Sequence, residues 1–387
     1  MVPIKYNVRN LVVRKSTTAA AAFGLALVVF VFACALMLAN GIERTLGRAA
    51  SPDVVVVMRK GSDTEMTSTV EDKQVSLVLA QAAQIGASKK PVGVGEVLAV
   101  VLLDKVGVDG VSNVTVRGVT EDVFAFRPSA KIIEGRAANA GSDEVVIGSG
   151  LKGRFKGMAI GESFELKKNR PMKVVGIFDD DGSAFESEVW ADVHVVRQAF
   201  GRSGAVSSVR VRLDSPSKFD AFKTLVESDR QLGLIAMREA DYVEKQSQAT
   251  GIMLKILGGM VAFFFGVGAM IGATITMNAQ VAGRSREIGT LRALGFSKGS
   301  ILFSFLIESL VLSLAGGAVG AVAAIGMKAV KLTMLNMGTF TEIVFGFEPT
   351  APIILSAVGL SAFMGLLGGF LPAVRAARVS PVEAMRG

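Results

Sequence analysis

The chain has 387 residues, of which 50% are hydrophobic and 20% are charged, and its mean hydropathy is +0.48. A soluble domain of this size carries more charge, so the composition predicts a membrane protein. The formal net charge of +8 does not indicate nucleic-acid binding, because the cations lie beside apolar runs and are not interleaved with stacking aromatic residues. The single cysteine, Cys34, and the single histidine, His194, exclude an internal disulfide and a metal centre with two imidazole ligands.

Residues 1–18 predict an interfacial amphipathic helix on the cytoplasmic side, since apolar side chains at positions 4, 8, 11 and 12 alternate with cations. Residues 19–42 carry no charge and are long enough to cross a bilayer core of roughly 30 Å, so they predict the first transmembrane helix. A basic start, an apolar run and Cys34 also fit a lipoprotein signal. The bulky Phe32 does not suit the cleavage site, and we interpret the segment as a retained span.

Residues 43–250 predict an extracytoplasmic domain with its own core. Strand and helix patterns alternate in its first part, at 53–59, 70–85, 97–103 and 111–119, and in its last part, at 207–213, 218–228 and 232–237. Between them, about 130–200, short strands and turns are dense. We therefore expect an α/β subdomain split in sequence, with a β-rich subdomain inserted at about 130–200. The predicted fold class is membrane α-helical, with four transmembrane helices and a large extracytoplasmic α+β domain between helices 1 and 2.

Few residues of this domain suggest a catalytic or metal-binding site. Asp179, Asp180 and Asp181 precede Gly182 but lack the alternating spacing of a calcium loop, so we expect a solvated turn. Ser149 lies in Gly-Ser-Gly and lacks the pattern that surrounds a hydrolase nucleophile. The sequence predicts no catalytic residue and no metal site.

Three further apolar segments predict transmembrane helices at residues 251–282, 299–328 and 350–374, joined by 283–298 and by a short periplasmic loop at 329–349. Cations are concentrated at the N-terminus, in 283–298 and in the tail 375–387. Because such cations mark the cytoplasmic side, we expect both termini in the cytoplasm and residues 43–250 on the outer side of the membrane. Glycine pairs at 268/272, 316/320 and 365/369 predict close helix packing, within the chain or across a dimer.

Glu308 is the only charged residue between Ile301 and Met327. A carboxylate within a bilayer costs about 2.5–3.5 kcal/mol on insertion scales, so we expect Glu308 to have a partner. It lies near the inner end of its span, which favours a bracing role beside residues 283–298. A proton relay would need more such groups.

The segment from Arg284 to Gly295 reads R-x-R-E-I-G-x-L-R-A-L-G and predicts a short basic helix between two spans. Ile288, Leu291 and Leu294 recur at three-residue steps as a narrow apolar stripe, and Gly295 predicts the end of the helix. The pattern fits either a connector on the membrane surface or a contact site for a cytoplasmic partner. The sequence contains no G-x-x-x-x-G-K-[ST] motif, so we expect this chain not to hydrolyse ATP through a P-loop of its own.

The 284–295 motif resembles the coupling-helix signature of the MacB/LolC/FtsX-type ABC transporter permeases, the type VII or mechanotransmission superfamily. The run from Gly368 to Arg386 resembles that family's ending, P-A-x-x-A-A-R-x-x-P-x-x-A-L-R. The order of one span, a large external domain and three spans also matches. Residues 134–136 and 143–148 are similar to the MacB-like periplasmic core.

The resemblance implies a permease dimer on two copies of a cytoplasmic ABC ATPase, in a bacterial inner membrane with residues 43–250 in the periplasm. A homodimer is favoured over a pair of paralogues, and the sequence does not decide between them. That ATPase would bind ATP and Mg²⁺, and no cofactor is expected in this chain. A periplasmic adaptor or carrier protein and membrane lipids are further expected partners, and nucleic acid is not. The residues implied to contact the ATPase are Arg286, Glu287, Ile288, Gly289, Leu291, Arg292 and Leu294.

By the same resemblance, ATP-driven movement of this coupling helix would pass along the second span to the external domain. The implied function is export of a periplasmic or membrane-associated substrate by a MacB-like transporter. Lipoprotein release of the LolC/LolE type and regulation of a cell-wall hydrolase of the FtsX type remain alternatives, and the sequence does not indicate the substrate.

Overall fold

The computed structural model describes residues 15–380 except 88–89, 91, 230 and 336–340. The chain divides into two compact units. We call residues 1–41, 251–330 and 346–387 the membrane unit, and residues 42–250 with 331–345 the inserted domain. Most of the predicted amphipathic helix at 1–18, and residues 381–387 of the predicted tail, lie outside the described residues.

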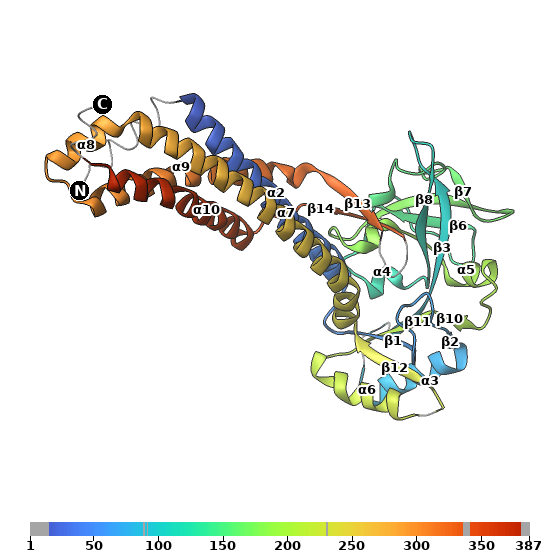
Figure 1. The fold of residues 1–387 in the computed structure, drawn as a ribbon. Helices are drawn as coiled ribbons and strands as arrows, with labels where there is room; N and C mark the ends of the chain where they lie inside the picture. Colours follow the sequence, from blue (N-terminus) through green and yellow to red (C-terminus); the bar gives the residue numbers. More distant parts are fainter. Residues whose placement is uncertain (1–14, 88–89, 91, 230, 336–340, 381–387) are drawn as a thin grey trace. The chain divides into compact units, whose positions relative to one another are not determined.

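Four helices in the described part of the chain are long and apolar enough to cross a membrane (Figure 1). They are α2 (Lys15–Arg48), α7 (Glu239–Gly283), α9 (Lys298–Gly326) and α10 (Ala351–Arg378). They correspond to the four predicted spans, although α2 begins four residues before the predicted 19 and α10 ends four residues after the predicted 374. The short helix η4 (Met327–Ala329) follows α9. Helices α2 and α7 also extend into the sequence of the inserted domain.

Glycines allow the helices of the membrane unit to approach closely. A Cβ on Gly320 of α9 would lie 2.3 Å from the carbonyl oxygen of Ala26 on α2. Gly365 of α10 faces α9, where the hydroxyl of Ser309 donates to the Gly365 carbonyl at 2.6 Å. The predicted glycine pairs at 316/320 and 365/369 therefore pack within the chain.

The glycine pair at 268/272 on α7 differs from the other two. A Cβ added at either position would meet no atom of the described residues within 4 Å. Together with Gly24 of α2, these glycines line an apolar groove of about 550 Å³ in the membrane unit. This pair does not pack within the described chain.

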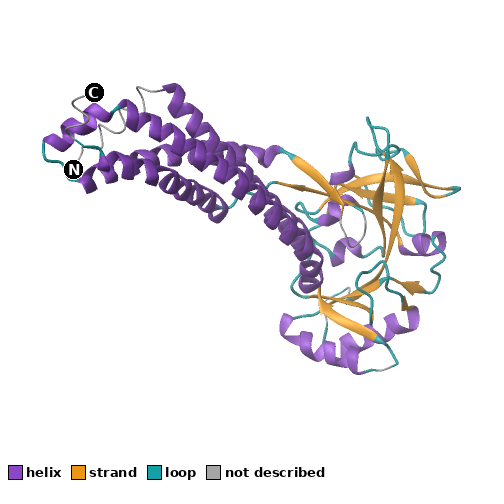
Figure 2. Cartoon of the chain, viewed as in Figure 1, coloured by secondary structure: helices purple, strands orange, loops and turns teal. Residues whose placement is uncertain are grey.

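The inserted domain is built on one sheet with the strand order β12-β1-β11-β3-β4-β9-β6-β8-β5, to which β7 adds beside β8. Figure 2 shows the strands of the domain in orange and its helices in purple. The strands are β1 (Val54–Arg59), β3 (Gly93–Asp104), β4 (Val111–Val119), β5 (Lys131–Gly135), β6 (Glu144–Gly148), β7 (Ser163–Lys167), β8 (Arg170–Asp179), β9 (Glu188–Asp192), β11 (Ser208–Arg212) and β12 (Leu234–Arg238). A separate pair joins β2 (Val70–Glu71) to β10 (Ala205–Val206).

Helices and short 3₁₀ turns complete the domain. They are α3 (Asp72–Gln84), α4 (Val123–Phe126), η1 (Ser149–Leu151), η2 (Ala184–Ser187), α5 (Val193–Ala199), η3 (Pro216–Lys218) and α6 (Phe219–Ser228). Valine-rich strands such as β1 are buried along almost their whole length, because helices or loops cover both faces.

The split architecture predicted for this domain is present with one difference. Strand β4, which the sequence pattern grouped with the first part, pairs in parallel with β9 of the β-rich part. Strand β3 joins the two parts, since residues 93–96 pair with β11 and residues 97–104 pair with β4. The two predicted subdomains therefore share one continuous sheet.

Residues 329–349, which we expected to be a short loop, contain two paired strands. These are β13 (Lys331–Leu335) and β14 (Glu342–Gly346), and residues 331–345 belong to the inserted domain. Five-residue strands are too short to show a reliable period, and the domain that supports them lies far away in the sequence.

The turn at 179–181 differs in part from the solvated turn that we expected, since Asp181 is exposed but Asp180 is buried. Asp180 is only 2% exposed, and the carboxylate of Glu186 accepts the backbone N–H groups of Asp180 and Gly182 at 3.0 and 2.6 Å. The carboxylate of Glu186 therefore organises the turn by accepting two of its backbone N–H groups.

Candidate functional site

The predicted coupling helix is a distinct helix, α8 (Ser285–Ala293), between α7 and α9 (Figure 1). Its start follows a break at Arg284, whose backbone leaves the helical region. Its end is a Schellman motif, in which Phe296 N–H donates to the Leu291 carbonyl at 3.2 Å and Gly295 N–H donates to the Arg292 carbonyl at 3.1 Å. Gly295 has a φ of +94°, which confirms the predicted stop.

The residues implied to contact an ATPase divide into three groups by exposure. Arg286, Glu287 and Leu294 are exposed, with Leu294 73% exposed. Leu291 and Arg292 are half-buried. Ile288 and Gly289 are buried.

The apolar stripe predicted at Ile288, Leu291 and Leu294 is therefore not one exposed surface. Ile288 is 2% exposed and belongs to a cluster that includes Val281 of α7, Phe305 of α9 and Ala376 of α10. The apolar residues do recur every three positions, but the first of them, Ile288, packs α8 onto the chain's own helices α7, α9 and α10.

Arg284 is the partner that we expected for Glu308. Its Nη1 lies 3.1 Å from Oε2 of Glu308, and the two side chains are 8% and 5% exposed. The guanidinium also lies 5.3 Å above the ring of Phe305 and 3.3 Å from the carboxylate of Glu287. This ion pair joins the α7–α8 junction to α9.

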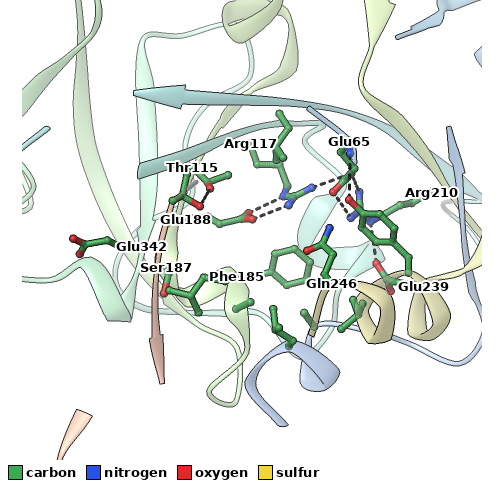
Figure 3. Close-up of a pocket in the computed structure, with 18 residues that line it drawn as sticks. Glu65, Thr115, Arg117, Phe185, Ser187, Glu188, Arg210, Glu239, Gln246 and Glu342 are labelled. Carbon is green, nitrogen blue, oxygen red and sulfur yellow. Dashed lines mark hydrogen bonds and ion pairs between the residues drawn. The ribbon is translucent and has the colours of Figure 1, made fainter. Parts of the chain in front are cut away.

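A second concentration of charge lies inside the inserted domain, and the sequence analysis missed it (Figure 3). We call it the charge cluster, and its members are Glu65, Glu96, Arg117, Arg127, Glu188, Arg210 and Glu239. Arg117 of β4 makes a two-point contact with Glu188 of β9, both distances being 2.7 Å. Arg210 of β11 contacts Glu65 at 2.6 Å and Glu96 at 2.5 Å.

Pairing with opposite charges shifts the pKa of Glu65 and of Arg117 in the direction that favours the ionised form. Burial by itself would raise the pKa of Glu65, but Arg210 and Arg117 hold that pKa far below its ordinary value. Burial would likewise lower the pKa of the Arg117 guanidinium, but Glu188, Glu65 and Glu96 raise it. The cluster therefore forms a fixed buried network, which loses stability when one partner is removed.

Glu239, the first residue of α7, connects this network to both helices that enter the domain. Its carboxylate accepts from Arg210 Nε at 2.9 Å and from Arg127 Nη2 at 3.0 Å. It also accepts from the backbone N–H of Ser51, three residues after the end of α2, at 2.9 Å. One carboxylate thus ties the end of α2, the start of α7 and strand β11 together.

A small cavity of about 60 Å³ lies beside the charge cluster (Figure 3). Arg117, Glu188 and Gln246 are among its lining residues. Its size and polarity suit a few water molecules rather than an organic substrate. Among the described residues, no group of three His, Cys, Asp or Glu side chains could hold a metal ion.

Two family models match the sequence. The MacB-like periplasmic core domain matches residues 18–228, and the FtsX-like permease C-terminal domain matches residues 259–381. The first match covers more than half of the chain.

Individual relatives agree with these matches. The macrolide export ATP-binding/permease protein MacB of Neisseria gonorrhoeae is 26% identical over 282 residues, covering 69% of this chain and 42% of that protein. The uncharacterized ABC transporter permease YvrN of Bacillus subtilis is 28% identical over 299 residues, covering 71% of each. The chain thus spans less than half the length of the MacB relative.

Among solved structures, the periplasmic region of MacB from Actinobacillus actinomycetemcomitans matches with a TM-score of 0.38 and 14% identity, covering 52% of this chain and 95% of that one. The family models together match residues 18–228 and 259–381. Helices α2, α7, α9 and α10, which are long and apolar enough to cross a membrane, mark the chain as a membrane protein. The chain belongs to the MacB-like family and is an ABC transporter permease of the MacB/FtsX type.

Proposed function

We propose that this chain is the permease subunit of a MacB-like exporter in a bacterial inner membrane, and that a separate cytoplasmic ATPase drives it. In this proposal α8 and both termini are cytoplasmic and the inserted domain is periplasmic. The position of the cations beside the spans supports this orientation. The ATPase carries ATP and Mg²⁺, and two ATPase copies serve a dimer of this chain.

The observation that carries the proposal is the division of α8 into a buried and an exposed side. Ile288 and the Arg284–Glu308 pair fix the helix to the rest of the membrane unit. Glu287 and Leu294 remain exposed for a partner. A helix that is anchored in this way moves together with the helices that hold it when a partner pushes on it.

Helix α7 supplies a route from α8 to the inserted domain. It runs without interruption through 45 residues, from Glu239 to Gly283, so it is about 68 Å long at a rise of 1.5 Å per residue. One end adjoins α8, and the other end is held in the charge cluster through Glu239. Force applied at α8 would therefore pass along α7 to Glu239, and from there to strand β11 through Arg210 and to the end of α4 through Arg127.

The substrate in this proposal is a molecule outside the inner membrane or associated with it. Within the third predicted span, the charge of Glu308 is engaged by Arg284, which supports a bracing role for that carboxylate. The relative named above is a macrolide exporter, which supports export as the outcome of the movement. A periplasmic adaptor would complete the path.

Purification of the tagged full-length chain from its native membrane, followed by mass spectrometry, tests the proposal. We expect an ABC ATPase in the purified complex and a periplasmic adaptor after mild cross-linking. A chain that purifies without any ATPase, from membranes in which ABC ATPases are detected, contradicts the proposal. If a peptidoglycan hydrolase co-purifies in place of the adaptor, the result favours regulation of a cell-wall hydrolase over export. If a lipoprotein carrier co-purifies, it favours lipoprotein release.

A further inference from the structure

The carboxylate of Glu342, on β14, is held by three side chains from other parts of the inserted domain. Lys105 Nζ and the Ser112 hydroxyl each lie 2.5 Å from Oε1, and Arg154 Nη2 lies 2.5 Å from Oε2. The side chain of Glu342 is only 9% exposed. We call these four residues the Glu342 clamp.

The two strands around the clamp are fastened at further points. The hydroxyls of Thr341 and Thr115 lie 2.8 Å apart in a buried contact. The backbone N–H of Val344 donates to the Ser187 hydroxyl at 3.0 Å. Arg154, which already holds Glu342, also donates to Thr333 on β13 at 3.3 Å.

The charges of the clamp favour a permanent contact. Burial alone would raise the pKa of Glu342, but Lys105, Ser112 and Arg154 lower it, so the carboxylate stays ionised and attractive to both cations. An ion pair with these short distances and low exposure is much less screened by salt than a surface pair.

The Glu342 clamp holds the segment that connects α9 to α10, so it can transmit force from these helices. Strand β13 follows α9 after only the short turn η4, and strand β14 ends five residues before α10 begins. A pull along α9 or α10 therefore acts on strands that are fastened to β4 and to the loop that carries Arg154.

We propose that the Glu342 clamp makes residues 331–345 a strut through which α9 and α10 move the inserted domain, in addition to the connections through α2 and α7. The proposal rests on the proposed function and adds Glu342 to it as a positioning residue. During the ATPase cycle the Glu342 clamp stays closed. A variant that opens the clamp uncouples the inserted domain from α9 and α10.

The test uses the full-length chain with its co-purified ATPase in nanodiscs. Glu342→Ala removes the clamp, and Glu342→Gln keeps the size of the side chain while removing its charge. The matched control is Glu134→Ala, because Glu134 forms an exposed ion pair with Lys152 in the same domain at the same 2.5 Å distance. All variants carry Cys34→Ser, Thr115→Cys and Thr341→Cys, so that oxidation can close the strut by a disulfide at the hydroxyl contact.

Under reducing conditions we expect Glu342→Ala to lower the kcat of ATP hydrolysis roughly threefold or more, as for other residues that carry coupling. Glu342→Gln should give a smaller loss, and the KM for ATP should not change. Oxidation should restore kcat in Glu342→Ala and change nothing in the Glu134→Ala control. Restoration by the disulfide separates a strut from a general loss of folding.

Two results would overturn the strut. One is an unchanged kcat in reduced Glu342→Ala, with hydrogen exchange showing that β13 and β14 have come loose. The other is a reduced kcat that oxidation fails to restore although the disulfide has formed. Absence of any ATPase from the wild-type preparation is a different result, since it contradicts the proposed function and the strut together.

Discussion

Nη1 of Arg284 lies 3.1 Å from Oε2 of Glu308, in the interior of the membrane unit. Arg284 stands at the break between α7 and α8, and Glu308 stands on α9. Because the pair spans these elements, the direction of α8 depends on an interaction that is hidden from solvent.

Removal of one partner of the Arg284–Glu308 pair should lower the free energy of unfolding substantially. Glu308→Ala leaves the buried Arg284 guanidinium without its partner on α9, and we expect a loss of about 3–5 kcal/mol in the free energy of unfolding. The double variant Arg284→Met with Glu308→Leu should recover most of it, because no buried charge is left. Denaturant unfolding in micelles measures the unfolding free energy of the single and the double variants. A loss in the double variant as large as the sum of the losses in the Arg284→Met and Glu308→Leu single variants would show that the two residues contribute independently.

Helix α8 and the spans were predictable because their signals are local. Uncharged runs of sufficient length mark the spans, and the glycine after a short basic helix marks its end at Gly295. The face that α8 exposes was not predictable. Periodicity places Ile288 and Leu294 on one stripe, but it cannot show that α9 and α10 cover only Ile288.

The charge cluster escaped prediction because its partners are distant in sequence. Arg210 and Glu65 are 145 residues apart, and Arg117 and Glu188 are 71 apart. Alternation in β11 places Arg210 on the opposite face from Val209 and Val211, which ordinarily indicates solvent. Strand β11 reads Ser-Val-Arg-Val-Arg, so Arg210 stands in a regular alternation that carries no local signal of burial.

The packing of the glycines leads to a second prediction. Gly320→Ala should destabilise the isolated chain by about 1–3 kcal/mol, because its Cβ would overlap the Ala26 carbonyl on α2. Gly272→Ala is the control, since its Cβ meets no described atom within 4 Å. Thermal unfolding in detergent compares the two. An unaffected Gly320→Ala would mean that α2 and α9 do not pack as described.

Loss of the Glu239 carboxylate should destabilise the charge cluster and lower the free energy of unfolding. Glu239→Ala leaves Arg210 and Arg127 without a shared carboxylate, and we expect a loss of about 3–5 kcal/mol in unfolding free energy. Glu134→Ala, which removes a solvent-exposed ion pair with Lys152, should cost at most about 1 kcal/mol. Similar losses in the two variants would argue against a tightly paired network.

Stability should fall in acid in a manner that depends on Glu65. Its folded-state pKa is lower than its unfolded value of about 4.3. The stabilisation is therefore complete above pH 4.3 and is lost as the pH falls toward the folded-state pKa. Glu65→Gln should flatten the unfolding free energy between pH 5 and pH 3, measured at constant ionic strength. A wild-type profile that is already flat there contradicts this assignment.

The most direct test of the central claim is association with the ATPase when the exposed side of α8 is changed. Leu294→Asp places a charge on a side chain that is 73% exposed, so the chain should still fold but should lose the co-purifying ATPase. Leu77→Asp, at a side chain of the inserted domain that is 50% exposed, is the matched control and should keep it. Full retention of the ATPase by Leu294→Asp, with an unchanged rate of ATP hydrolysis, would contradict the role of α8 as the ATPase contact.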